Sequence, residues 1–227
     1  MSRSTSLDLL KWLAIVTMIG DHLRYLWPEQ DWLFVTGRLA FPFFCLALAA
    51  NVSRSTVIRW RYLWWFVGFS LLSEVPYRWL DNGSLTLNVM PTLGLGLLVA
   101  WGVHLRSRAT TAMAVLAAIT ATLGSEWLMY GLPGVLLPAA LLMALKDGRF
   151  AWLAGLLAVA GNFTNSWLFQ HPLAPMSMMV AGTAFMAVFI GLELLRREWP
   201  GRVLSVGRWG WWFYPVHLAV IKLLSLL

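Results

Sequence analysis

Long apolar stretches alternate with short charged or Gly/Pro-rich connectors along the whole chain. Most stretches approach the roughly 20 residues that an α-helix needs to cross a lipid bilayer. The pattern therefore predicts an all-α fold, a polytopic membrane helical bundle of about nine transmembrane segments. The expected segments are residues 9–27, 32–52, 58–79, 85–105, 109–129, 132–145, 150–168, 175–195 and 209–227.

The sixth expected segment, residues 132–145, is the shortest and contains Pro133, Gly134 and Pro138. Proline and glycine inside a span favour a kink, so this segment is expected to bend or to cross the bilayer only in part. The sequence shows no internal repeat and no low-complexity segment. We therefore expect residues 1–227 to form one transmembrane domain.

Composition strengthens the assignment to the membrane. Of the 227 residues, 59% are hydrophobic and only 12% are charged, whereas an ordinary soluble domain is about 25% charged. Nine spans use almost all of this length and leave no room for a soluble domain. Cys45 is the only cysteine, which excludes an internal disulfide and a thiolate metal cluster.

The excess of basic residues predicts how the chain is oriented. In a soluble protein, 17 Lys and Arg against 10 Asp and Glu would suggest nucleic-acid binding, but here the charges fall in connectors on one side. They are Arg3, Arg54, Arg59, Arg61, Arg106, Arg108, Lys146, Arg149, Arg196, Arg197, Arg202 and Arg208. Basic connectors stay in the cytoplasm. We therefore expect a cytoplasmic N-terminus, a C-terminus on the opposite side, and no nucleic-acid partner.

Several polar residues fall at a similar depth in the outer half of the expected spans. They are Asp21, His22, Arg38, Glu74, Arg78, Asn88, Glu126, Asn162 and Asn165. An unpaired charge at mid-bilayer costs roughly 2.5 to 3.5 kcal/mol, so such residues normally face a protein interior or a water-filled cavity. The layer predicts a cavity that opens outward. Alternatively, its arginines only neutralise its carboxylates and lock the helices together.

The first span places Lys11 and His22 eleven residues apart. At about 100° and 1.5 Å per residue, this spacing is three turns plus roughly 20°, with a rise of about 16 Å, so both residues share one helix face. Histidine titrates near neutral pH and suits proton transfer. The face could line a passage with an anion at its inner mouth and a base deeper inside. Alternatively, Lys11 pairs with Asp8, one turn away.

His217 lies in the last expected span beside a proline, where it either packs or lines the cavity. The histidines of the chain do not show metal-ligand spacing, and we expect no metal cofactor. The sequence also contains no phosphate-binding loop, no nucleophile elbow and no dinucleotide fingerprint.

Six blocks of the sequence resemble the TraX family of conjugative pilin acetylases in their order and spacing. The blocks are "LKWLAIVTMIGDH", "GRLAFPFFCLALA", "LLSEVPYRW", "LNVMPTLGLGLL", "YGLPGVLLP" and "FYPVHLAVI". The resemblance covers nearly the whole chain. The Lys11 to His22 arrangement is also similar to the Arg/Lys-to-His element of the broader transmembrane acyltransferases.

The resemblance implies an acetyltransferase of the bacterial inner membrane, with its C-terminus in the periplasm. Such an enzyme moves an acetyl group from cytosolic acetyl-CoA to an outward-facing amine, the N-terminus of a pilin. Two alternatives remain open. One is O- or N-acetylation of an envelope glycan or lipid, and the other is a non-enzymatic transporter or pilus-assembly scaffold.

The resemblance also implies a set of site residues. The matching blocks give His22 as the base, with Asp21 and Arg38 beside it. Arg38 or Asn88 would stabilise the oxyanion, and His22 could instead carry the acetyl group itself. We expect Lys11, Arg54, Arg61 and Arg208 to hold the donor's anionic groups, with Arg59, Arg106 and Arg108 as further candidates, unless these arginines only set orientation. Glu74, Asn88 and His217 are expected to line the cavity.

Overall fold

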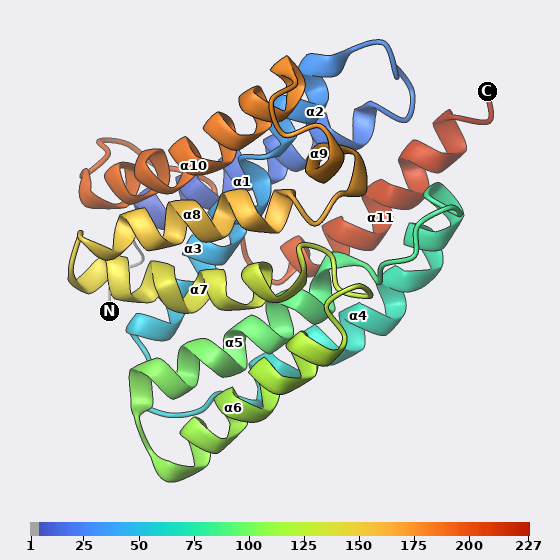
Figure 1. Ribbon diagram of the computed structural model, residues 1–227. Coiled ribbons are helices and arrows are strands. Elements are labelled where there is room, and N and C mark those ends of the chain that lie inside the picture. The colour runs from blue at the N-terminus through green and yellow to red at the C-terminus, as the bar shows by residue number, and fades with distance from the viewer. Residues whose placement is uncertain (1–4) are drawn as a thin grey trace.

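The computed structural model describes residues 5–227, and every regular element in this range is a helix (Figure 1). Arg3, which we assigned to the cytoplasmic side, lies outside the described residues. The helices are α1 (Thr5–Leu23), α2 (Asp31–Gly37), α3 (Ala40–Ser53), α4 (Trp60–Leu80), α5 (Val89–Leu105), α6 (Arg108–Leu123), α7 (Gly131–Lys146), α8 (Phe150–Asn162), α9 (Ser166–Gln170), α10 (Pro175–Arg196) and α11 (Trp209–Leu224).

Each of the nine expected segments contains a helix, but two segments are divided. The second expected segment holds α2 and α3, and the seventh holds α8 and the short α9. The sixth segment forms α7 as one helix with Pro138 inside it. The fifth segment was predicted too long, because α6 ends at Leu123 and Glu126 is exposed in the turn that follows.

Short polar side chains set the start of several helices. The side chain of Asn88 accepts a hydrogen bond from the backbone N–H of Met90 at the start of α5. Ser107 forms a capping box with Thr110 at the start of α6. The side chain of Asn165 accepts hydrogen bonds from the backbone N–H groups of Trp167 and Leu168 at the start of α9. This cap starts a new helix inside an otherwise continuous apolar segment. Such caps satisfy N–H groups that have no partner within the helix.

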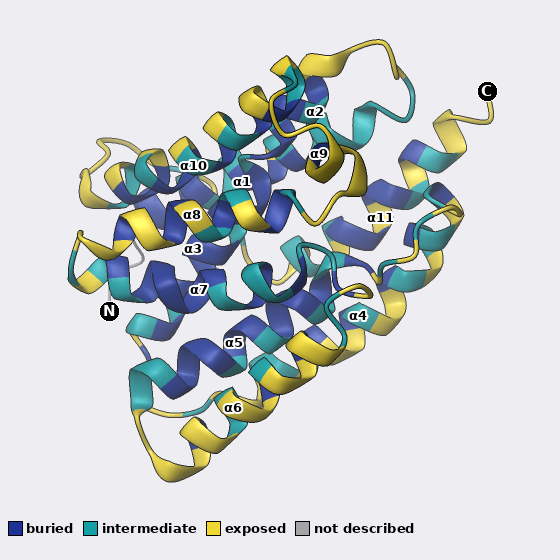
Figure 2. Ribbon diagram, viewed as in Figure 1, coloured by how far each residue is buried: buried dark blue, intermediate teal, exposed yellow. Residues whose placement is uncertain are grey.

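Helix α3 lies at the centre of the molecule and is buried over most of its length (Figure 2). It packs against α1, α5, α7 and α10. The close approach of α10 to α3 depends on Gly191 of α10, where an added Cβ would lie 2.7 Å from Cδ2 of Leu46 in α3. Small residues at such contacts let helix backbones come close together, as is common in membrane bundles.

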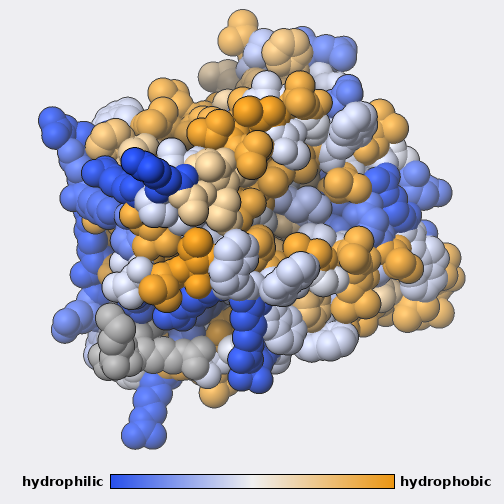
Figure 3. All heavy atoms as spheres, turned by 90° about the horizontal axis from the view of Figure 1, so that it is seen from below, coloured by the Kyte–Doolittle hydropathy of each residue, from blue (hydrophilic) through white to orange (hydrophobic). Residues whose placement is uncertain are grey.

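The outer surface of the bundle is strongly apolar. Exposed large side chains include Leu71 and Val75 on α4, Leu116 on α6 and Leu156 on α8. Figure 3 shows hydrophobic residues over much of the face seen from below, with hydrophilic side chains gathered mainly towards one end. An apolar surface of this extent is typical of a membrane protein.

Two helical segments are long and apolar enough to cross a membrane. They are Asp31–Ser53, which comprises α2 and α3, and Pro175–Arg196, which is α10. The helices α5, α6, α7 and α8 are apolar but shorter. The crossing of the bilayer by all nine segments therefore stays a prediction.

The start of α1 and the C-terminus lie at opposite ends of the bundle (Figure 1). The connectors between α5 and α6 and between α7 and α8 lie at the end where α1 begins. Both of these connectors carry basic residues. The arrangement agrees with the sidedness that we inferred from charge, and the orientation in the membrane stays a prediction.

Candidate active site

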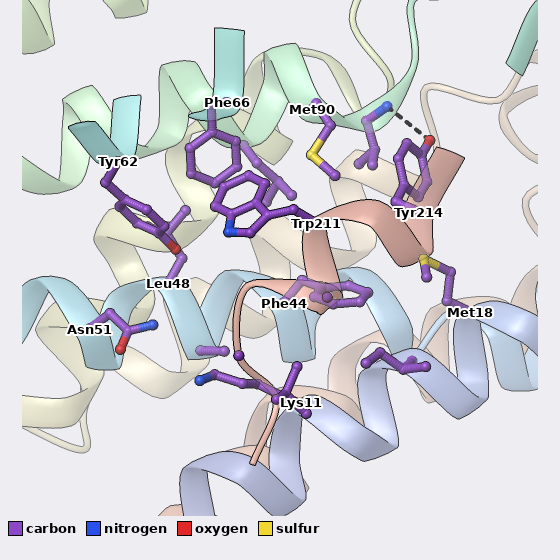
Figure 4. A pocket seen from close by; sticks show the side chains of 17 residues that line it. Lys11, Met18, Phe44, Leu48, Asn51, Tyr62, Phe66, Met90, Trp211 and Tyr214 are labelled. Atoms are coloured by element: carbon purple, nitrogen blue, oxygen red, sulfur yellow. Dashed lines mark hydrogen bonds between the residues drawn. The ribbon is translucent and has the colours of Figure 1, made fainter. Parts of the chain in front are cut away.

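An apolar cavity of about 220 Å³ lies between α1, α3, α4, α5 and α11. We call it the deep cavity. Figure 4 shows Lys11 and Asn51 towards one end, Met18 and Tyr214 towards the other, and Trp211 between them. The cavity therefore has polar groups at both ends, Lys11 and Asn51 at one and the Tyr214 hydroxyl at the other.

Helix α1 contributes one continuous face to the deep cavity. Lys11, Ile15 and Met18 all line it, and their spacing of four and three residues is that of a single helix face. His22 follows Met18 by one more turn on this face. It lies beyond the lining residues, just past the end that Met18 marks.

His22 meets His217 of α11 at this position. Nδ1 of His22 lies 2.9 Å from Nε2 of His217, and the two ring centroids are 4.9 Å apart. His217 is buried, and it follows the cavity-lining Tyr214 by three residues. Two of the helices that border the deep cavity, α1 and α11, thus carry a histidine one turn further on, and the two rings meet there.

Lys11 has both of the roles that we considered from its spacing. Its Nζ lies 3.6 Å from Oδ1 of Asp8, and it also lines the deep cavity. Asp8 in turn accepts a hydrogen bond of 3.3 Å from the backbone N–H of Val206. Since Val206 lines the same cavity, this ion pair helps to fix the connector between α10 and α11 against α1.

A second, more open cavity of about 400 Å³ adjoins the deep cavity. The two share Asn51, Tyr62 and Trp211 as lining residues. Because it also includes three exposed arginines, we call it the basic vestibule. These arginines are Arg59, Arg61 and Arg208. Guanidinium groups bind phosphates through paired, charge-assisted hydrogen bonds, so the vestibule is suited to an anionic ligand.

Comparison with known proteins identifies the family to which this chain belongs. The family model described as TraX protein matches residues 6–225. The chain belongs to the TraX family. It is 31% identical to Protein TraX of Escherichia coli, over 96% of this chain and 87% of that protein. Protein TraX of Escherichia coli strain K12 gives the same identity and coverage.

A more distant relative of this TraX-family chain is Uncharacterized protein RP591 of Rickettsia prowazekii strain Madrid E. The two are 30% identical over 90 residues, which is 39% of this chain and 34% of that protein. No solved structure matches the chain.

The buried Arg38 forms an ion pair with the half-buried Asp21, between Nη2 and Oδ1. Arg38 also donates to Oδ1 of Asn162 at 3.3 Å and to the carbonyl of Phe34 at 3.0 Å. Gly37 makes room for this pair, because a Cβ there would lie 2.6 Å from Oδ1 of Asp21. The pair thus joins α1, α2 and α8, which is the helix-locking arrangement that we considered as the alternative. Among the described residues, neither side chain hydrogen-bonds the His22 ring.

Glu74 and Asn88 lie in a separate polar cluster. The Glu74 carboxylate accepts hydrogen bonds from Nδ2 of Asn88 at 2.7 Å and from Nε of Arg78 at 2.7 Å. Nδ2 of Asn88 also donates to the carbonyl of Ser70 at 2.7 Å, so both amide hydrogens are in use. Asn88 caps α5, and neither it nor Glu74 is among the described residues that line the deep cavity.

The polar layer that we expected is therefore divided. Asp21 with Arg38 forms one cluster and Glu74 with Asn88 forms another. Glu126 is exposed. The structure also separates the expected donor-binding residues, because Lys11 lines the deep cavity and Arg61 and Arg208 line the vestibule. Arg54 is exposed and lines neither cavity.

Sequence reasoning missed several lining residues. Arg59 was considered with the other inner arginines as a possible phosphate ligand but was not chosen as a site residue; it caps the start of α4, whose first turn carries Arg61. Asn51 is a polar residue at the inner end of an apolar segment, which was a usable signal. Tyr214 stands three residues before His217 in the block "FYPVHLAVI". Its hydroxyl accepts a long 3.5 Å hydrogen bond from the backbone N–H of Val89, and its own proton remains available to donate.

Proposed function

We propose that this chain is an integral membrane acetyltransferase that moves an acetyl group from cytosolic acetyl-CoA to an outward-facing amine. The N-terminus of a pilin is the acceptor that the family resemblance favours. One observation carries the proposal. The deep cavity begins beside a basic vestibule, and a histidine pair lies one helical turn past Met18 and Tyr214 at its other end, with Lys11 and His22 on the same face of α1.

The orientation that the proposal needs has the vestibule on the cytoplasmic side of the bacterial inner membrane. Its support is the one-sided distribution of basic connectors, which stay cytoplasmic in membrane proteins. With nine crossings, the C-terminus then lies in the periplasm. The outer end of α1, which carries His22, faces the side on which a translocated acceptor is found.

The donor fits the charges and the shape of the two cavities. The phosphates of acetyl-CoA carry several negative charges, and Arg59, Arg61 and Arg208 of the vestibule match them. The narrow pantetheine arm would pass between Lys11 and Trp211 into the deep cavity. Its thioester end would then approach the histidine pair, while the nucleotide end stays in the vestibule.

The chemistry requires one base and one oxyanion donor. An α-amine has a pKa of about 8, so a base has to remove one proton as the nitrogen attacks the thioester carbon. His22 takes this proton and returns it to the thiolate as the carbon–sulfur bond breaks. The products are the acetylated amine and coenzyme A. The hydroxyl of Tyr214, at the deep end of the cavity, would stabilise the oxyanion by donating a hydrogen bond.

Intact-mass measurement of a co-expressed pilin tests this proposal. Cells would express the pilin with the wild-type chain, with His22→Ala or without the chain. We expect an added acetyl group only with the wild-type chain. An acetylated pilin in cells with His22→Ala would remove His22 from catalysis. An unmodified pilin with the wild-type chain would exclude this acceptor.

A further inference from the structure

We propose that His217 is a positioning residue, which holds the proton of His22 on Nδ1 and thereby leaves the lone pair of Nε2 for the acceptor amine. This inference rests on the proposed role of His22 as the base. It deepens that role by naming the ring nitrogen that acts and the residue that determines it.

The hydrogen bonds of the pair fix the direction of donation. Nδ1 of His217 lies 3.0 Å from the carbonyl oxygen of Phe213. A carbonyl can only accept, so this nitrogen carries the N–H. A neutral imidazole has a single N–H, so Nε2 of His217 is an acceptor. The proton in the 2.9 Å contact with His22 therefore belongs to Nδ1 of His22.

The ring of His217 is also held in its orientation by packing. It stacks on the ring of Phe213, with centroids 5.1 Å apart and planes 5° from parallel. The ring of Tyr214 lies against it at 5.6 Å. Because His217 is only 7% exposed, water does not compete strongly for its acceptor nitrogen. A locked acceptor of this kind favours the Nδ1–H tautomer of its partner. The His22 ring also has a hydrogen bond with the backbone of Met18, so His217 is one of two groups that hold it.

His217 orients His22 and does not carry the proton onward. After His22 takes the amine proton on Nε2, both of its nitrogens carry a hydrogen, and Nδ1 still donates to His217. A proton passed further would have to leave Nδ1 of His217 towards the Phe213 carbonyl, which cannot take it. A proton can therefore move no further than the histidine pair, and it returns to the coenzyme A thiolate through Nε2 of His22.

His171 gives a matched control within the same chain. Its Nδ1 also bonds the carbonyl four residues earlier, that of Trp167, at 3.1 Å. It is exposed in the connector after α9. His171 thus reproduces the local backbone contact of His217 without the link to His22. We expect His171→Gln to leave acetyl transfer unchanged.

Histidine ring-nitrogen chemical shifts test the tautomer without any assay of activity. The protein would be labelled with isotopic histidine, and the His22 signals are those that disappear in His22→Gln. We expect a protonated Nδ1 and an unprotonated Nε2 in the wild type, and loss of this fixed state in His217→Leu. A wild-type His22 ring that is protonated on Nε2 overturns the inference.

Kinetics separate positioning from a merely structural role. We expect His217→Leu to lower kcat on the order of a hundredfold, while the KM for acetyl-CoA stays within roughly twofold. His217→Gln offers an amide oxygen as acceptor and should recover part of the loss. An unchanged kcat in His217→Leu would overturn the inference, as would an equal loss in both variants. If the wild type transfers no acetyl group, the proposed function fails, and this inference fails with it.

Discussion

At the scale of single residues, α1 carries one polar group at each end of the face that it turns to the deep cavity. Lys11 stands where the deep cavity begins, and His22 stands one turn past Met18, where the cavity ends. The helix rise between them is about 16 Å. Each residue also has a protein partner, Asp8 for Lys11 and His217 for His22, so both side chains are held in place before any ligand binds.

Lys11→Ala should weaken donor binding more than it slows the chemical step. Lys11 lies where the deep cavity begins, so its loss removes one charge-assisted contact to the donor, worth about 1.5 to 3 kcal/mol. We expect the KM for acetyl-CoA to rise about tenfold or more, and kcat to change much less. Steady-state kinetics over a range of acetyl-CoA concentrations measures both.

Lys222→Ala is the matched control, because Lys222 lies in the last turn of α11 and does not line the described cavities. Its KM should equal that of the wild type. Equal KM values for the two lysine variants would remove Lys11 from donor binding.

The shared face of Lys11 and His22 could be predicted because it depends only on the regular geometry of one helix. The partner of His22 could not be predicted in this way. His217 is 195 residues away in the sequence, and only the packing of α11 beside α1 brings the rings together. The sequence alone therefore left His217 divided between packing and cavity lining.

At the scale of elements, the junction between α2 and α3 is held by the ion pair of Asp21 and Arg38. Arg38 caps the end of α2 and reaches both α1 and α8. The apolar run over residues 32–52 predicts one long span, because hydrophobicity alone does not show where a helix is interrupted. The division into α2 and α3 accompanies contacts with other helices, which the pattern along the chain does not contain.

Gly37→Ala should destabilise the protein through this junction. The new methyl group would lie 2.6 Å from Oδ1 of Asp21, so the carboxylate or α2 must shift. Overpacking of this kind costs about 1 to 3 kcal/mol, and we expect a lower Tm for the protein in detergent. Gly182→Ala in α10 is the control, because no atom lies within 4 Å of its added Cβ. A Tm for Gly37→Ala equal to that of the control would contradict the tight approach.

Two arginines near the start of α4, Arg54 and Arg61, allow a test of whether the vestibule binds the donor. Arg61 lines the vestibule, whereas Arg54 is exposed and lines neither cavity. We expect Arg61→Ala to weaken acetyl-CoA binding several-fold, in titrations with the purified protein, with a smaller effect at high salt. Arg54→Ala should bind like the wild type. An equal loss of acetyl-CoA affinity in both variants would indicate a general effect of the protein's net charge and would argue against a binding site in the vestibule.

At the scale of the whole molecule, the apolar stretches predicted a helix in each of nine segments, but not the division of two of these segments into two helices each. The stretches also could not show which polar residues meet. Glu74 and Asn88 were assigned to the same layer as Asp21, but they form a cluster of their own around the start of α5. The sequence predicts how deep a residue lies in the membrane, but not which side of its helix bundle it is on. The position around the bundle depends on how the helices pack.

Cysteine labelling tests the orientation of the bundle. In a Cys45→Ala background, Thr56→Cys places a thiol in the connector between α3 and α4, and Gly83→Cys places one between α4 and α5. Both positions are exposed. A membrane-impermeant thiol reagent added outside the cytoplasmic membrane should label Gly83→Cys but not Thr56→Cys, because only the connector between α3 and α4 is expected to be basic and cytoplasmic. The reverse labelling would place the vestibule on the outer side.

The central claim is that an acetyl group crosses from a cytosolic donor to an outward-facing amine at His22. Sealed vesicles of known orientation test it most directly, with isotopically labelled acetyl-CoA on the face that carries the basic connectors and the pilin on the other face. Mass spectrometry of the pilin N-terminus should show the label with the wild-type chain and none with His22→Ala. Labelling that is unchanged in His22→Ala, or that requires the donor on the pilin side, would contradict the account.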